Sequence, residues 1–499
     1  MKQLRGFIIL SFLSFLLGGA AHAQNAQAGT RAFPRLESDP RALEFFRRSV
    51  TNNGGSWTDL AEMALWASGG NASDLERIRA AANSIARAHD LPAGKRGQAE
   101  FILSWLHKNV LISYSLNQTR VDTIFANGRF NCVSSGVLYL ILCKSLGIEA
   151  DGVMTRDHAL VTVHIDGESI DVETTNAYGF DPGSRKEFHD DFGRLTGFSY
   201  VPARNYRDRQ TITAAELISL IMTNRISDLE SRNLFSEAIP LAIDRAAFLT
   251  GLGRTTGSYS SSAFFEDPGK DMLNRLYNYS AFLLNSGREE DCLAWTTLAS
   301  HTYPNGTRWQ EFIHGAVNNR IHRFVQAGHI TQARDFLEAN KSGLTNNNYA
   351  QLDAQIFDAE LLDRANKIRT AAEGESVIAD IHEGRRGGRI NERRADELMT
   401  FSILKTAERI GAAPLRDWLG AENFIEHCIS RYGSNRELER ALQNYRNNRA
   451  VDYHNRFAAA WNRRDYDEAR RILGEGLKEF PENRQLLNDR DTVNRSTSR

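Results

Sequence analysis

Hydrophobic positions recur at helical spacing across residues 58–113, in three successive segments. These segments are DLAEMALWA, DLERIRAAANSIARAHDL and AEFILSWLHKNV. The next apolar segment, residues 132–146, is hydrophobic on nearly every side, which predicts a helix buried at the centre of a domain. Gly147 followed by Ile148 is typical of a glycine that ends a helix together with a hydrophobic contact.

The pattern changes to strict alternation in DHALVTVHIDGESIDVETT, residues 157–175. Asp166-Gly167 is a strong signal for a two-residue hairpin turn. If Ile165 lies opposite Glu168, one face of the hairpin is apolar throughout. The opposite face then carries the remaining side chains of the two strands, which are His158, Leu160, Thr162, His164, Asp171, Glu173 and Thr175. A slip of one residue would mix the two faces, so we predict this register.

After about residue 208 the pattern is helical to the end of the chain. The segment from residue 463, RRDYDEARRILGEGLKEFPENRQL, resembles the second helix of a tetratricopeptide repeat, with Ala469 followed by Gly476 and Pro481. Three other segments carry this spacing wholly or in part, and they centre on Cys292, Ala333 and Ala238. Because the gaps between them are uneven, we expect a degenerate helical array and not a regular 34-residue repeat.

The N-terminus has the three parts of a secretory signal peptide. Lys2 and Arg5 precede an apolar run at residues 7–17, and Ala21-His22-Ala23 is a small-residue cleavage site. The apolar run is about half of the ~20 residues that a membrane-spanning helix needs. We therefore expect a periplasmic or secreted protein that starts near Gln24 and has no stable membrane insertion.

The composition argues against several classes of protein. The chain has 61 basic and 62 acidic residues, which gives no indication of a nucleic-acid or anionic-membrane partner. Four cysteines are too few for a disulfide scaffold, although two bridges are compatible with an oxidising compartment. A bridge between Cys132 and Cys143 is excluded if both lie on one helix, because about 16 Å would then separate them.

The position of Cys132 along the chain favours a reactive thiol. A thiol in the first turn of a helix lies near unpaired N–H groups, which favour the thiolate. The thiolate needs a base beside it, and His158 follows one strand later. The histidine in turn needs a carboxylate on its far nitrogen, for which Asp171 and Glu173 are available on the same face.

These elements resemble the transglutaminase-like (transglutaminase core) superfamily, whose papain-like catalytic order is Cys, His, Asp. The resemblance covers roughly residues 56–205 and is carried by FNCVSSGVLYLILCKSLGIEA, DHALVTV and IDVETTN. It implies that Cys132 is the nucleophile and His158 the base. The family commonly has Asp about fifteen residues after the histidine, and here Glu173 has that position.

The hairpin register separates the two carboxylates. Glu173 would lie one diagonal from His158, at ~7 Å. Asp171 would lie opposite Thr162, some 13 Å from His158, too far for a hydrogen bond. We therefore predict Glu173 as the third member of the triad and keep Asp171 as the alternative.

Other interpretations of these residues remain open. Cys132 is also compatible with a packing role in a buried helix, and Cys143 is expected to have one. A metal site from Cys132, His158 and His164 lacks the usual ligand spacing, so we expect neither metal nor cofactor. For an oxyanion, the backbone N–H of Cys132 is the favoured donor and the Asn131 side chain the other candidate.

We thus predict an α+β protein followed by a helical array. A signal peptide (1–23) and an irregular segment (24–55) precede a papain-like, transglutaminase-like domain of helices plus antiparallel sheet (56–207). An all-α, tetratricopeptide-like domain (208–499) follows. The expected function is thiol acyl transfer or hydrolysis, by a peptidase, amidase or cross-linking enzyme, on a peptide or protein substrate presented by the helical-repeat domain. The alternative is an inactive scaffold that binds a protein or peptide partner through its helical repeats.

Overall fold

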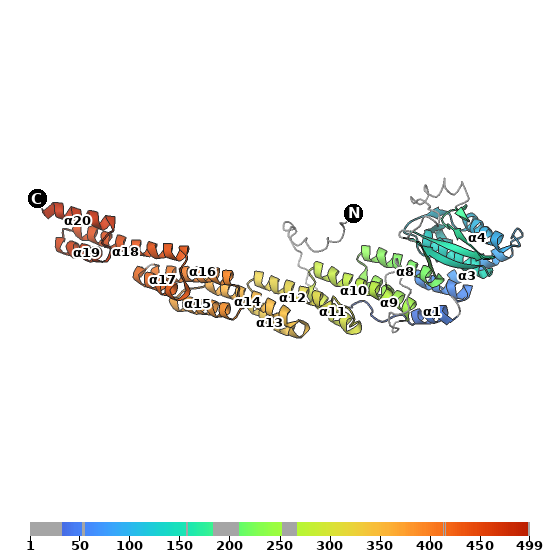
Figure 1. The fold of residues 1–499 in the computed structure, drawn as a ribbon, viewed down its shortest axis with the longest axis horizontal. Helices are drawn as coiled ribbons and strands as arrows, with labels where there is room; N and C mark the ends of the chain where they lie inside the picture. The colour runs from blue at the N-terminus through green and yellow to red at the C-terminus, as the bar shows by residue number, and fades with distance from the viewer. Residues whose placement is uncertain are drawn as a thin grey trace. The chain divides into compact units, whose positions relative to one another are not determined.

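The computed structural model describes residues 32–51, 55–155, 158–182, 209–251, 267–412, 414 and 416–497. The predicted signal peptide lies outside these residues. The chain divides into two compact units, Met1–Arg275 and Leu276–Arg499. The structure is mostly helical with a small antiparallel sheet, which agrees with the predicted α+β class and helical region (Figure 1). Within the described ranges, no helix combines the length and the apolar character needed to cross a membrane.

The sheet of the first unit has four antiparallel strands in the order β5-β4-β3-β6. Their bounds are β3 Glu149–Met154, β4 Ala159–Ile165, β5 Glu168–Val172 and β6 Gln210–Ile212. Ile165 pairs with Glu168 and Val163 with Ile170, so the predicted hairpin and its register are confirmed. Both turn residues have positive φ, 50° at Asp166 and 84° at Gly167, as the sequence Asp-Gly allows.

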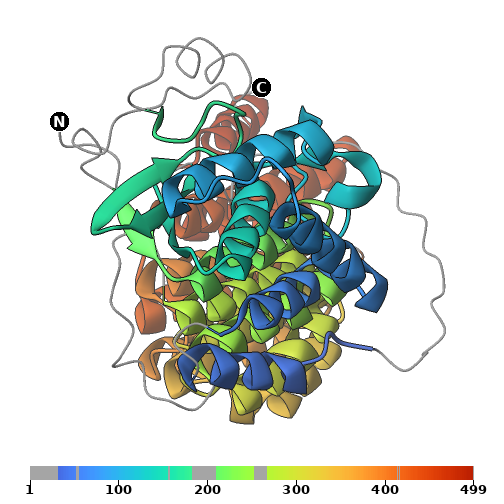
Figure 2. The same cartoon turned by 90° about the vertical axis from the view of Figure 1, so that its right-hand side faces the viewer.

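The helix α6 (Cys132–Ser145) forms the centre of this unit. All its residues from Val133 to Cys143 are buried, which fits its apolar surface on every side. It contacts strands β3 and β4 together with three helices, which are α2 (Trp57–Ser68), α4 (Lys95–Asn109) and α8 (Ala214–Ser231) (Figure 2). The unit also contains α3 (Ala72–Ala86), α5 (Ile124–Asn127) and α9 (Phe235–Thr250).

A short parallel pair of strands leads into α6. Strand β1 (Ser113–Tyr114) pairs with β2 (Arg129–Phe130), so that Tyr114 lies opposite Phe130. Residue 130 is only two positions before Cys132. The pairing therefore fixes the direction in which the chain enters the helix.

Two features of this unit differ from the expected boundaries. Residues 24–55 were expected to be irregular, but Pro40–Thr51 form helix α1, whose Ala42 and Phe45 are buried. The segment is amphipathic, with apolar residues at 42, 43, 45, 46 and 50 among charged ones, and the helix packs against α9. In addition, α8 and α9 belong to the first unit and not to the helical one, because α8 packs on α2, α6 and β3.

The second unit is helical throughout its described residues, and α10 (Pro268–Asn285) crosses into it. The others are α11 Glu289–Thr302, α12 Trp309–Gln326, α13 Ile330–Ala339, a 3₁₀ turn Lys341–Gly343, α14 Asn346–Asn366, α15 Ala371–Arg386, α16 Glu392–Gly411, α17 Trp418–Tyr432, α18 Arg436–Asn462, α19 Tyr466–Glu479 and α20 Arg484–Thr497. Consecutive helices pack together. The small residues of the repeat pattern lie at these contacts, and a Cβ at Gly476 of α19 would stand 3.0 Å from Cβ of Tyr453 on α18.

The hairpin turn provides a test of the sheet. We expect Gly167→Ala to lower the free energy of unfolding by about 1–2 kcal/mol, because a Cβ is strained in the left-handed conformation. Asp166→Asn is the matched control and should change little, since Asn accepts positive φ. Urea denaturation of the full chain measures both, and equal stability of all three proteins would contradict the turn assignment.

Candidate active site

Cys132 is the first residue of α6 and is half-buried, with a free thiol. Asn131 caps the helix, because its Oδ1 accepts hydrogen bonds from the N–H groups of Val133 (3.1 Å) and Ser134 (3.0 Å). Ser134 Oγ in turn accepts from the Asn131 N–H at 3.0 Å. This reciprocal cap fixes the helix start. It also leaves the Cys132 N–H without an acceptor among the hydrogen bonds of the described residues.

The loop of residues 115–123 holds the helix start from outside. Asn131 Nδ2 donates to the Leu116 carbonyl at 2.9 Å, and Ser134 Oγ donates to the Gln118 carbonyl at 2.8 Å. Asn131 therefore uses its amide oxygen in the cap and one of its two amide N–H groups in this loop. The thiol therefore lies at a helix terminus at which hydrogen bonds hold Asn131 and Ser134 in place.

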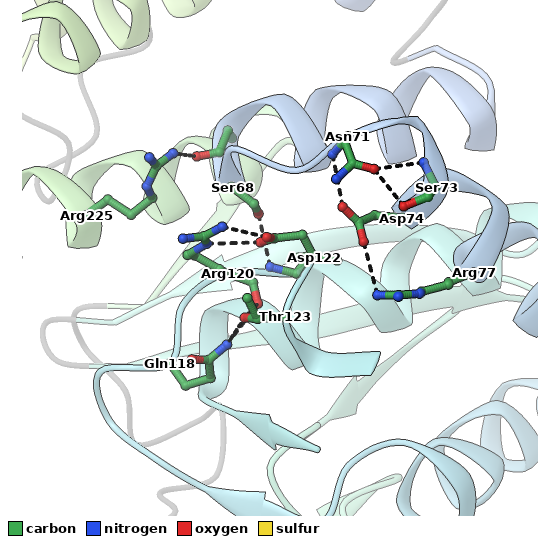
Figure 3. Close-up of polar contacts among 12 residues, drawn as sticks. Ser68, Asn71, Ser73, Asp74, Arg77, Gln118, Arg120, Asp122, Thr123 and Arg225 are labelled. Atoms are coloured by element: carbon green, nitrogen blue, oxygen red, sulfur yellow. Dashed lines mark hydrogen bonds and ion pairs between the residues drawn. The ribbon is translucent and has the colours of Figure 1, made fainter. Parts of the chain in front are cut away.

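The same loop is attached to the end of α2. Val121 N–H donates to Ser68 Oγ at 3.0 Å, and Arg120 binds the Asp122 carboxylate with two hydrogen bonds (Figure 3). Arg225 of α8 donates to the carbonyl of Ala67 beside it. The contact with Ser68 attaches the loop to α2, and the Arg225 contact joins α2 to α8.

His158 and Glu173 form a buried pair beside this helix start. His158 Nε2 lies 2.6 Å from Glu173 Oε2, with His158 9% exposed and Glu173 fully buried. The Cys132 sulfur is near enough to the same imidazole to raise its pKa. Since Nε2 contacts the carboxylate, Nδ1 is the ring nitrogen available to the thiol. The structure thus brings together Cys132, His158 and Glu173.

The Glu173 carboxylate is held on its other oxygen as well. Oε1 accepts from the Thr175 N–H at 3.1 Å and from Thr175 Oγ1 at 2.7 Å. The Glu173 N–H donates to the Gly179 carbonyl at 2.8 Å, and a Cβ at Gly179 would collide with the Glu173 carbonyl oxygen. The tight loop of residues 173–179 therefore requires glycine at this position and aims the carboxylate at His158.

Two further side chains join the acid segment to the rest of the site. Ser135 Oγ donates to the Asn131 carbonyl at 2.8 Å and lies 2.8 Å from Thr174 Oγ1. His107 Nε2 donates to the Thr174 carbonyl at 3.1 Å. The sequence pattern indicated no role for Ser135, Thr174 or His107, and it placed Thr175 on the polar face of the hairpin without a role. Only the polar Ser134-Ser135 pair inside an apolar helix gave a signal in the sequence.

The two histidines near Glu173 have opposite charge preferences. Burial lowers the pKa of His158, but the Glu173 charge and the Cys132 sulfur outweigh it, so that its pKa is raised well above the usual value. Burial also lowers the pKa of His107, and there the Thr174 carbonyl and the Glu173 charge offset it only in part. His158 is therefore the protonated imidazole and His107 the neutral one at pH 7.

Asp171 and His164 lie in other interactions. Asp171 binds Arg209 with both oxygens, one of them at 2.6 Å, and accepts from Thr162 Oγ1 at 2.9 Å. His164 pairs with the exposed Asp151 at 3.0 Å. The structure therefore places Glu173, and not Asp171, beside His158. Across the described residues, no three His, Cys, Asp or Glu side chains are grouped as a metal site would require.

The other three cysteines differ from Cys132 in exposure. Cys143, Cys292 and Cys428 are buried and free. Burial raises the pKa of Cys143 to about 12, and of Cys292 and Cys428 to about 11. At neutral pH these thiols are inert, so that Cys132 is the only cysteine in a position to react.

Comparisons of the chain with protein-family models, with curated proteins and with solved structures gave no match. The interpretation of the site therefore depends on its own geometry.

The buried pair predicts a pH-dependent stability. With its pKa raised, His158 binds in the native state a proton that the unfolded chain releases near pH ~6.5. The pair stabilises the protein fully below that pH, and this contribution is lost as the pH rises through the raised native pKa. We expect Glu173→Gln to cost about 3–5 kcal/mol below pH ~6.5, and less as the pH rises.

Urea denaturation at several pH values measures this difference. Asp151→Asn is the control, because it breaks the exposed pair with His164 and should cost no more than about 1 kcal/mol. A cost of Glu173→Gln that stays constant with pH would contradict the assigned protonation of His158.

Proposed function

We propose that this protein is a transglutaminase-like cysteine enzyme that performs thiol acyl transfer or hydrolysis, with Cys132, His158 and Glu173 as its triad. The observation that carries the proposal is the buried contact of 2.6 Å between His158 and Glu173, beside a half-buried cysteine at a helix start. Structural cysteines, such as Cys143, are buried without such partners. A helix-start thiol next to an oriented imidazolium is the arrangement of an activated nucleophile.

The proposed reaction follows from the positions of the three groups. The Cys132 thiolate attacks the carbonyl carbon of an amide or ester, and the C=O electron pair moves onto oxygen, towards the Cys132 N–H. His158 then donates its proton to the leaving amine or alcohol as the carbon–heteroatom bond breaks. Water or an amine attacks the resulting thioester, with His158 accepting its proton and Cys132 leaving as thiolate. Glu173 remains ionised and orients the ring throughout.

The architecture supports a papain-like arrangement for residues 56–207. The cysteine stands at the start of a central buried helix, and the histidine and acid lie at one end of an antiparallel hairpin packed against it. This is the order and placement that the family resemblance implies. The proposal extends to a periplasmic or secreted location, on the basis of the signal-peptide pattern at residues 1–23.

The substrate that we propose is a peptide or protein. Ile112 and Leu116, on either side of Tyr114, are 79% and 66% exposed, and the Leu116 carbonyl binds the helix cap of Cys132. Apolar side chains exposed next to a reactive thiol favour an acyl donor with apolar side chains of its own. The helical second unit, with its buried small residues at helix contacts, would present such a partner in the manner of a tetratricopeptide array.

Selective alkylation tests the proposal. We expect iodoacetamide at pH 7 to modify Cys132 and to leave Cys143, Cys292 and Cys428 unmodified in the native protein, as measured by mass spectrometry of peptides. His158→Ala should slow the modification by about an order of magnitude or more, because an unassisted thiol is only a few per cent thiolate at pH 7.

A matched pair of variants tests whether Glu173 or Asp171 is the third member of the triad. Glu173→Gln should slow the alkylation of Cys132, whereas Asp171→Asn, two residues earlier in the chain, should not. An inert Cys132 in the native protein would contradict the enzyme and favour the scaffold that binds a protein or peptide partner.

A further inference from the structure

The hydroxyl of Tyr114 is a buried donor without a hydrogen-bond partner among the described residues. Tyr114 lies on β1, in register with Phe130 of the strand that leads to Cys132. Its ring meets the Phe130 ring edge-on, with 6.1 Å between centroids and an interplanar angle of 86°. This contact holds the ring in place. A buried polar group left unpaired is costly, and such groups are rare unless they have a function.

The packing places this residue near the candidate site, because β1 pairs with the strand that leads into α6, and Tyr114 and Cys132 pack against the same hydrophobic core. Burial raises the pKa of Tyr114, and the charges of Cys132 and Glu173 raise it further, which agrees with a sulfur and a carboxylate near the phenol. They also ensure that the phenol keeps its proton at neutral pH, so that it is a hydrogen-bond donor there.

The attack of Cys132 on a carbonyl group produces an oxyanion that needs donors. The Cys132 N–H is one, since the cap leaves it without an acceptor. Two amide side chains close by already have partners, since Asn131 Nδ2 donates one of its two N–H groups to the Leu116 carbonyl and Gln118 Nε2 donates to Thr123 Oγ1 and the Arg120 carbonyl. An oxyanion site normally has two donors, and the buried hydroxyl of Tyr114 has no partner among the described residues.

We infer that Tyr114 is a catalytic residue, whose O–H donates a hydrogen bond to the oxyanion formed when Cys132 attacks the substrate carbonyl. The inference rests on the proposed function. In the attack the C–S bond forms, and the C=O electron pair moves onto the oxygen that receives the two hydrogen bonds. This role explains why the hydroxyl has no partner before the reaction, because its hydrogen bond forms only as negative charge develops on the carbonyl oxygen.

The test compares two reagents on one thiol. p-Nitrophenyl acetate acylates Cys132 through an oxyanion and releases p-nitrophenolate, whereas iodoacetamide alkylates it by direct displacement at carbon, without an oxyanion. We expect Tyr114→Phe to slow the Cys132-dependent release of p-nitrophenolate by roughly 10²-fold. The alkylation rate should stay at the wild-type value. Tyr466→Phe, the same change on a 45% exposed residue of α19, is the matched control and should alter neither rate.

The outcomes separate the two proposals. If wild type and Cys132→Ala release p-nitrophenolate equally and iodoacetamide leaves Cys132 unmodified, the proposed function fails. If Cys132 is acylated in wild type and equally fast in Tyr114→Phe, the role of Tyr114 is overturned. Equal slowing of acylation and alkylation would also overturn it, because the hydroxyl would then act on the thiolate.

A second measurement covers the case in which Tyr114→Phe does not fold. 3-Fluorotyrosine placed at position 114 alone reports the environment of the phenol by ¹⁹F NMR. Addition of acetaldehyde forms a hemithioacetal on Cys132, whose oxygen occupies the place of the oxyanion. We expect the ¹⁹F resonance to shift on addition in the protein with Cys132 and not in the Cys132→Ala variant. The same spectrum in both would contradict the proposal.

Discussion

The buried contact between His158 and Glu173 is the interaction on which the arrangement of the first unit depends. Removing two charges from water is expensive unless each is paired and its remaining hydrogen bonds are made. Glu173 meets this condition with the N–H and Oγ1 of Thr175 on one oxygen and the imidazole on the other. The loop of residues 173–179 must therefore keep one conformation, and the hairpin must keep one register.

The position of the thiol depends on a different set of forces. The buried helix α6 fixes the direction of its own axis through apolar contacts on all sides, and the Asn131 cap fixes the residue at which it begins. The contact between Ser135 and Thr174 joins this helix start to the acid segment. Packing therefore sets the helix, and a few hydrogen bonds then set the distance between the nucleophile and its base.

The sequence was sufficient for the parts of the site that depend on local rules. Asp166-Gly167 and the alternation around it determined the hairpin register, and the register placed Glu173 and not Asp171 near His158. The register also placed Asp171 opposite Thr162, but its ion pair with Arg209 was not predictable, because Arg209 lies 38 residues further along the chain. Tyr114 and His107 were missed for the same reason, since tertiary packing brings them to the site and no periodic pattern marks them. Thr175 was placed on the polar face of the hairpin, but its contacts with Glu173 form in the loop beyond the strand. The membership of α8 in the first unit was missed because the apolar face of an amphipathic helix does not identify the surface on which it packs.

One carboxylate gives the two neighbouring histidines different roles. His158 contacts Glu173 directly, and the attraction overcomes the effect of burial, so its pKa rises. His107 feels the same charge without contact and donates to the Thr174 carbonyl, so burial prevails and its pKa falls. In the proposed mechanism, the protonated ring is thus already next to the thiol before a substrate arrives. The ring is therefore in place to donate its proton to the leaving group. The neutral His107 holds the acid segment in place without adding a second positive charge that would compete for Glu173.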